Sequence, residues 1–319
     1  MYNAGSNTTA GSFSYSNGTR TNAGSQTVSW TFTPTDTTNY NTKSGSFNVS
    51  IATRPINVTA GSDSKTYDKS ALIYNSATAE STGTNRGLVS GHSMTSCTVT
   101  GTITNVGSTN NVPSSAVIKS GSTDVTSNYS ITYANGTLTV SQRTVTLTWG
   151  TLTWTYDGSS HSTTCTAGNL CSGDTCTVTL YNNTAGPNVN TSYGGNNVIA
   201  AELSNSNYKL PSSKTATLII NARSVTYKAN DESWTYDGNT HSASNTATLT
   251  SGSLVSGHTA TFSCTGSVGP NVGTATKTLS SVTIKNSGGT DVSSNYSITK
   301  NNGTLSIIKA NQSAPTATD

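Results

Sequence analysis

The sequence predicts an all-β protein made of small repeated β-modules in an elongated tandem array. Three observations support this prediction: β-branched residues alternate with polar ones, apolar and charged residues are scarce, and a set of motifs recurs at fixed offsets. Stretches such as TVTLTWG and TATLIIN alternate as half-buried strands do, and no window of a dozen residues has apolar side chains at helical spacing. Only 31% of the 319 residues are apolar and 9% are charged, which is below ordinary globular usage.

Charge and cysteine content argue against several classes of function. The 16 basic and 13 acidic side chains are scattered, so we expect no groove for nucleic acid. No apolar run approaches the roughly 20 residues that cross a bilayer, so we expect no membrane insertion. The opening residues, MYNAGSNTTAGS, lack the basic and apolar regions of an export signal. The five cysteines lack paired C-x2-C spacing, so we expect no metal site and no cofactor, with buried thiols or one local disulfide as the alternatives.

Three motifs recur in order along most of the chain. An Arg opens an alternating strand at Arg54, Arg143 and Arg223, and a Tyr-Asp pair follows 13 residues later in every copy. A turn phrase such as LVSGH comes next, and an Asn-Tyr pair then precedes a closing strand such as NGTLTV. The motif residues are the members of the Tyr-Asp pairs and the tyrosines of the Asn-Tyr pairs. They are Tyr67, Asp68, Tyr156, Asp157, Tyr236, Asp237, Tyr40, Tyr129, Tyr208 and Tyr296.

The motif positions predict the division of the chain. We expect a partial repeat over 1–52, full repeats over 53–142, 143–222 and 223–309, and a linker over 310–319. The partial repeat has an Asn-Tyr pair but no opening strand and no Tyr-Asp. Two explanations stay open: the chain is cut from something longer, or its ends complete each other between molecules.

The string WTYDG, which occurs at 154–158 and 234–238, predicts a strand that runs into a tight turn. We expect the Tyr ring to be buried with its hydroxyl bonded to the backbone, and the Asp to accept hydrogen bonds from turn amides. The alternative is a catalytic carboxylate, which needs a second titratable group at fixed geometry. His161 and His241 follow the Tyr by five residues, but Leu72 takes that place in the first full repeat. We therefore predict a structural motif and no enzymatic activity.

The position two residues before the Tyr holds Trp154, Trp234 and, in the first full repeat, Lys65. A buried lysine without a partner is costly, whereas a half-exposed lysine can lay its stem along apolar surface. We therefore expect both tryptophans to be partly buried, where successive modules touch. The alternative is that they stack on a host or cell-wall glycan. His92 and His258 follow Ser-Gly, and we expect both to face solvent from turns.

The order of Tyr-Asp-Gly, Leu-Val-Ser-Gly and a closing Asn-Tyr before Asn-Gly-Thr-Leu resembles the YDG and MBG (mostly β-grasp) repeat modules of bacterial surface proteins and adhesins. The resemblance covers 53–309 and, more weakly, the partial repeat. It implies a β-grasp-like or Ig-like module strung head to tail in a cell-surface stalk, with no enzymatic residues to carry over. The chain departs from the pattern at His92 and His258, where the family more often has Asp, and at Lys69, which replaces a Gly.

These predictions lead to a structural stalk or fibre, extracellular and on a bacterial cell surface, that spaces a binding domain from the cell. At about 3.3 Å per residue, a ten-residue strand spans about 33 Å, so four modules in line would reach on the order of 120 Å. The expected partners are neighbouring modules of the same chain. In a variant, the chain is a homopolymer in which C-terminal strands of one copy complete the partial repeat of the next. The alternatives are a carbohydrate-binding module that uses Trp154 and Trp234 and, last, a hydrolase built on the repeated aspartates.

Overall fold

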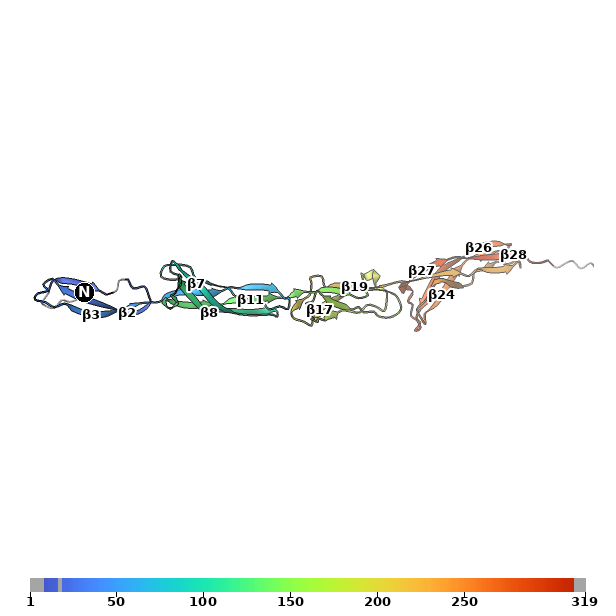
Figure 1. Ribbon diagram of the computed structural model, residues 1–319. Helices are drawn as coiled ribbons and strands as arrows, with labels where there is room; N and C mark the ends of the chain where they lie inside the picture. Colours follow the sequence, from blue (N-terminus) through green and yellow to red (C-terminus); the bar gives the residue numbers. More distant parts are fainter. Residues whose placement is uncertain (1–8, 17–18, 313–319) are drawn as a thin grey trace, which may run out of the picture. The chain divides into compact units, whose positions relative to one another are not determined.

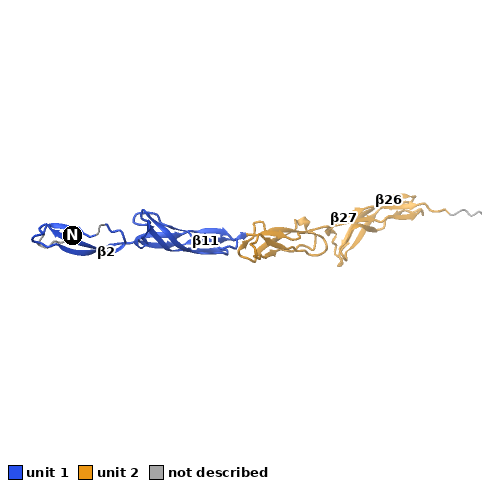
Figure 2. Cartoon of the chain, viewed as in Figure 1, with its two compact units in different colours: residues 1–143 blue, residues 144–319 orange. Residues whose placement is uncertain are grey.

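The computed structural model describes residues 9–16 and 19–312 (Figure 1). These residues form strands β1 to β28 and three single-turn 3-10 helices, so the predicted all-β class is confirmed. No helix in the described part of the chain is long and apolar enough to cross a membrane. The chain divides into two compact units, residues 1–143 and 144–319, shown in separate colours in Figure 2. Each unit is described by itself.

Unit 1 begins with a three-stranded antiparallel sheet in the order β1-β2-β3. The register places Phe13 opposite Phe32 and Tyr15 opposite Trp30. Because side chains alternate across a strand, aromatic residues share one face and Ser and Thr residues occupy the other. The strands are β1 (Gly11–Tyr15), β2 (Gly24–Pro34) and β3 (Lys43–Ile51).

The rest of unit 1 forms two further sheets. The sheet orders are β10-β4-β6 and β5-β11-β8-β7, with β9 beside β8. The core includes Ile56, Ile118 and Tyr129, which are at most 6% exposed. The strands are β4 (Arg54–Ala60), β5 (Asp63–Thr66), β6 (Ala77–Ala79), β7 (His92–Thr100), β8 (Gly107–Ser120), β9 (Thr123–Asp124), β10 (Tyr129–Ala134) and β11 (Gly136–Ser141), with 3-10 helix η1 (Thr126–Asn128) before β10.

The first part of unit 2 contains the four-stranded sheet β14-β19-β17-β16 and the two-stranded sheet β13-β15. Val198, Leu218 and Ile220 are fully or almost fully buried. The strands are β12 (Arg143–Thr144), β13 (Thr146–Trp149), β14 (Thr153–Thr155), β15 (Cys165–Gly168), β16 (Val178–Tyr181), β17 (Asn196–Leu203), β18 (Tyr208–Lys209) and β19 (Thr215–Asn221), with 3-10 helix η2 (Thr191–Tyr193) before β17.

The second part of unit 2 contains sheets β23-β20-β27, β21-β28-β26-β24 and β22-β25. Ile284, Leu305 and Ile307 are buried in its core. The strands are β20 (Arg223–Ala229), β21 (Glu232–Thr235), β22 (His241–Ser242), β23 (Ala247–Gly252), β24 (Thr259–Thr265), β25 (Ser267–Val268), β26 (Gly273–Lys285), β27 (Tyr296–Asn301) and β28 (Gly303–Ile308), with 3-10 helix η3 (Ser293–Asn295) before β27.

Residues 54–141 and 223–308 share one connectivity, in which the opening strands pair in parallel with the closing strands. The first strand pairs with the second-last (β4 with β10, β20 with β27), and the second strand pairs with the last (β5 with β11, β21 with β28). The register sets Arg54 opposite Tyr129 and Arg223 opposite Tyr296. The Arg that opens each of these ranges therefore lies beside the Tyr of its closing Asn-Tyr.

The last strand of each range starts at a glycine because the backbone approaches another chain segment closely there. A Cβ on Gly136 would lie 2.1 Å from the carbonyl oxygen of Gly61, and one on Gly303 would lie 2.4 Å from that of Ala229. No side chain fits at these distances. The glycines at the start of β11 and β28 therefore reflect a packing requirement.

Candidate functional site: the joints between repeats

The closing Asn-Tyr pair of residues 223–309 reaches into the preceding residues of unit 2. The Asn295 side chain accepts a hydrogen bond from the Val189 amide at 2.9 Å and donates one to Asn188 Oδ1 at 3.0 Å. Asn295 is 4% exposed, so both bonds are largely shielded from water. A cleft of about 510 Å³ lies beside them, lined by segments 187–193 and 286–295.

Aromatic rings meet at the same joint. The Tyr156 ring contacts Tyr296 edge-on, with centroids 5.5 Å apart, and lies 6.1 Å from the His258 ring. Arg223 Nη1 also donates to the Tyr156 carbonyl oxygen at 3.4 Å. Tyr156 is only 3% exposed, and this burial, with the nearby Tyr296 hydroxyl, raises its pKa, although a hydrogen bond from Asn295 acts in the opposite direction. One apolar cluster therefore runs through the joint.

Unit 1 contains a joint of the same construction. The Asn128 side chain accepts a hydrogen bond from the Ala23 amide at 2.8 Å and contacts Asn22 Oδ1 through its Nδ2 at 3.2 Å. A smaller cleft of about 360 Å³ adjoins it. In both units, the Asn of an Asn-Tyr pair thus binds an Asn-Ala or Asn-Val pair that lies 105 to 107 residues earlier in the sequence.

The turn phrase holds the tyrosine of the Asn-Tyr pair in each full repeat. The Tyr129 hydroxyl contacts His92 Nδ1 at 2.7 Å and accepts a bond from the Val89 amide, and the Tyr296 hydroxyl contacts His258 Nδ1 at 2.8 Å. The prediction that these two histidines face solvent from turns is therefore wrong. Both are half-buried, because their imidazoles are partners of a buried phenol.

Asp174 takes the place of the histidine in 143–222. The Tyr208 hydroxyl donates to Asp174 Oδ2 at 2.7 Å and accepts from the Cys171 amide at 2.9 Å. Burial raises the pKa of Tyr208, and the Asp174 carboxylate raises it further. His and Asp therefore serve one purpose at this position, which is to bind the phenol.

Trp154 and Trp234 are half-buried and stack on histidines of their own repeats. The Trp154 and His161 rings are 4.9 Å apart and inclined by 13°, and His161 Nε2 lies 3.1 Å from Asp157 Oδ1. The second copy repeats this arrangement. The Trp234 and His241 rings are 4.7 Å apart and inclined by 8°, and His241 Nε2 lies 3.1 Å from Asp237 Oδ1. The expected partial burial of both tryptophans is confirmed, and Trp154 also packs against the apolar cluster that runs through the joint.

The first full repeat replaces this stack with an ion pair. Lys65 Nζ lies 2.7 Å from Asp68 Oδ1, and Leu72 is buried at the position of the histidines. Trp occurs with His and Lys with Leu, so each Asp has a nitrogen partner although no single residue type recurs. The signal in the sequence was that the two positions change together between copies, and comparing the copies could have revealed the nitrogen partner of each Asp.

These contacts lower the pKa values of the motif aspartates. The Lys65 ammonium, helped by Ser70, lowers the pKa of Asp68 to about 2. Burial alone would raise the pKa of Asp157, but the Ser159 amide and His161 outweigh it and lower the pKa. For Asp237, the hydrogen bonds from Asn239 are the main cause of its lowered pKa. A carboxyl group with a lowered pKa is ionised near neutral pH, so it accepts hydrogen bonds and is poorly suited to donate a proton in acid catalysis.

A buried ion pair in the last repeat was not predicted. Lys277 on β26 is fully buried, contacts the Glu232 carboxylate and donates to Thr246 Oγ1 at 3.0 Å. Burial raises the pKa of Glu232, but the Lys277 ammonium and Ser244 prevail and lower it to about 2. The alternation Ala-Thr-Lys-Thr-Leu over 275–279 places the lysine on the apolar face, which was the available signal.

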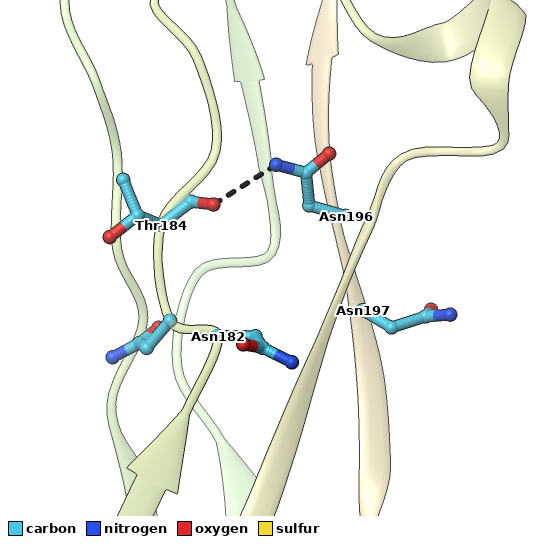
Figure 3. Close-up of a pocket in the computed structure, with 5 residues that line it drawn as sticks. Asn182, Thr184, Asn196 and Asn197 are labelled. Atoms are coloured by element: carbon cyan, nitrogen blue, oxygen red, sulfur yellow. Dashed lines mark hydrogen bonds between the residues drawn. The ribbon is translucent and has the colours of Figure 1, made fainter.

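A depression of about 640 Å³ in unit 2 is lined by amides and a hydroxyl. Figure 3 shows the Asn196 side chain directed at Thr184, whose carbonyl oxygen accepts its hydrogen bond at 3.0 Å, while Asn197 points away. None of its lining residues titrates near neutral pH. In the described part of the chain, no group of three His, Cys, Asp or Glu side chains is placed to hold a metal ion, and the five cysteines are free thiols.

Comparison of the sequence with models of known protein families gives no match, and comparison with curated proteins also gives none. The motif residues are instead placed by the contacts above. Tyr129, Tyr208 and Tyr296 bind the turn phrase of their own repeats, and Tyr156 lies in the joint of unit 2.

Proposed function

We propose that the chain is a structural stalk of a bacterial surface protein or adhesin, extracellular, that spaces a binding domain from the cell. The observation that carries the proposal is the repeated joint, in which Asn128 and Asn295 each attach one repeat to the preceding one with the same two hydrogen bonds. The recurring residues serve cohesion, and in tandem arrays cohesion between neighbours supports repeats with thin cores. The resemblance of the motif order to repeat modules of surface proteins supports the proposed location.

The surface composition agrees with this role. Only 9% of residues are charged, and Ser, Thr and Asn side chains cover the outward faces of the strands. Such a surface stays hydrated and contains few titrating groups, so its properties should vary little with pH or salt. The neighbouring repeats of the same chain are then the principal partners.

Mechanical unfolding of the whole chain, held at both ends in a force microscope, tests the proposal. Repeats of about 80 to 90 residues that fold separately should each release about 290 to 320 Å of chain at ~3.6 Å per residue. We expect at least three force peaks with that spacing. A single event that releases the whole chain would show that the repeats are not serial units and would contradict the proposal.

The second candidate function is glycan binding, and one observation favours it at a new position. Phe13, Tyr15, Trp30 and Phe47 line an open apolar surface on the β1-β2-β3 sheet, with Phe13 53% and Tyr15 61% exposed. Trp154 and Trp234, the residues first considered, are already stacked on histidines. Quenching of tryptophan fluorescence by a glycan panel, lost in Tyr15→Ala, would support this function. No response to any glycan would rule it out.

A further inference from the structure

Tyr156 and Tyr236 occupy the same place in two consecutive repeats. The Tyr156 amide donates to the carbonyl oxygen of Asn221 at 2.8 Å, and the Tyr236 amide donates to that of Ile308 at 2.9 Å. Each tyrosine follows a strand that pairs in parallel with the last strand of its repeat, β14 with β19 and β21 with β28. The two rings therefore mark the same end of the repeat.

The surroundings of the two tyrosines differ sharply, and the expectation that the Tyr ring of WTYDG is buried is wrong for Tyr236. Tyr156 is 3% exposed, because residues 223–309 cover it, whereas Tyr236 is 45% exposed. Val272, the counterpart of Val189, is 47% exposed, and Ile308 beside it is 54% exposed. Asn271, the counterpart of Asn188, is also exposed. We call Tyr236, Asn271, Val272 and Ile308 the end surface.

The residues of the end surface are neighbours in the sheet. Ile307 pairs with Trp234 on one side and with Gly273 on the other. The residues one position further along each of these three chain segments therefore lie side by side at the same end of the sheet. Those residues are Ile308, Thr235 with Tyr236 after it, and Val272.

The joint in unit 2 shows which chemistry covers such a surface. There, the Asn295 side chain accepts from the Val189 amide and donates to the Asn188 side chain, and the Tyr296 ring packs edge-on against Tyr156. The partner that fits the end surface is therefore an Asn-Tyr pair of the kind that recurs in these repeats. In the described part of the chain, Lys309 to Gln312 are exposed, and Ala310 stands where Arg223 opens the next repeat. These residues leave the end surface open.

One Asn-Tyr pair of the chain remains available. Tyr129, Tyr208 and Tyr296 are between 2% and 6% exposed, whereas Tyr40 is 52% exposed, and Asn39 is also at the surface. Asn39 is held by Asp36, which accepts from its Nδ2 at 2.7 Å. We propose that the end surface of one molecule binds the Asn39-Tyr40 pair of a second copy of this chain. The inference rests on the proposed function and names a partner for the stalk.

This contact joins two different surfaces, so it does not close into a symmetric dimer and continues from one molecule to the next. The partial repeat has no counterpart of Arg223 or His258, so the contact is smaller than the joint within unit 2. We expect weak association, with Kd on the order of 100 µM. The earlier variant, in which added strands complete the partial repeat, would instead use the β1-β2-β3 sheet.

Sedimentation velocity of the whole chain, between about 1 µM and about 1 mM, tests the proposal. We expect the sedimentation coefficient to rise with concentration beyond that of a dimer. Val272→Arg and Tyr40→Ala should each abolish the rise, whereas Tyr193→Arg, at a residue that is 89% exposed, should not. A mixture of the first two variants should stop at one-to-one dimers, because only one functional pair of surfaces remains. Circular dichroism spectra and melting temperatures matching those of the wild type show that the variants fold.

Three results would overturn the proposal. The first is a wild-type chain that stays monomeric at the highest concentration, and the second is association that persists in both Val272→Arg and Tyr40→Ala. The third is association that is abolished by Phe13→Ser but unaffected by Val272→Arg, which would assign the contact to the open β1-β2-β3 sheet. The force experiment separates this inference from the proposed function, since a monomer with several unfolding peaks would end the inference alone.

Discussion

Replacing Asn295 with alanine should uncouple the two repeats of unit 2. The substitution removes the bonds to Val189 and Asn188 and leaves the partly buried Val189 amide without its acceptor. Each net hydrogen bond contributes about 1 kcal/mol, and an unsatisfied buried donor costs about 1–3 kcal/mol. We expect the free energy for opening the joint to fall by about 2 kcal/mol, which is roughly a 30-fold change in the opening equilibrium.

Amide hydrogen exchange measures this quantity directly, because it reports local opening and needs no two-state unfolding. Protection of the Val189 amide should fall by roughly 30-fold in Asn295→Ala, with amides of the β26 core unchanged. Asn301→Ala, at an exposed residue of β27, is the matched control. A cycle with Asn188→Ala should return a coupling energy of about 1 kcal/mol. If protection at Val189 is the same in the variant and the wild type, Asn295 does not hold the joint.

Three further predictions follow from the contacts of single repeats. Lys277→Met should destabilise the last repeat by about 3–5 kcal/mol because it leaves Glu232 without its cation, and a second change of Glu232→Leu should recover most of that loss; equal melting of wild type and Lys277→Met would refute the buried pair. His258→Asp, which copies Asp174, should keep the melting temperature, whereas His258→Phe should lower stability by about 1–3 kcal/mol; the two variants melting alike would show that the Tyr296 contact is dispensable. Because the pKa values of Asp68 and Glu232 are lowered to about 2, their stabilising effect is present above their unfolded values and should be lost as the pH falls from about 4.5 to about 2; melting curves over that range check this, and a flat profile would contradict it.

The fold class was predictable because it depends on local alternation. Segments such as TATLIIN over 215–221 place every second side chain on one face, and this pattern survives in the structure as β19. The tyrosines of the Asn-Tyr pairs also stood out, since they recur in every copy. Their partners did not, because His92 and Asp174 differ in type while binding the same hydroxyl.

The joints were not predictable from the sequence, because they join residues about a hundred positions apart. Asn295 and Asn188 are 107 residues apart, and Asn-Val is an unremarkable pair in an Asn-rich chain. Lys277 was missed for a different reason. A lysine in a polar strand is ordinarily assigned to solvent, and its burial becomes tolerable through its contacts with Glu232 and Thr246. The parallel pairing of opening and closing strands likewise depends on contacts that no local pattern encodes.

Small-angle X-ray scattering from the whole chain in dilute solution tests the central claim that the repeats act in series as a stalk. Modules in line that reach on the order of 120 Å have a radius of gyration of about 35 Å. A compact globule of 319 residues would have a radius of gyration of about 20 Å. A value near 35 Å is the predicted result, and a value near 20 Å would contradict the account.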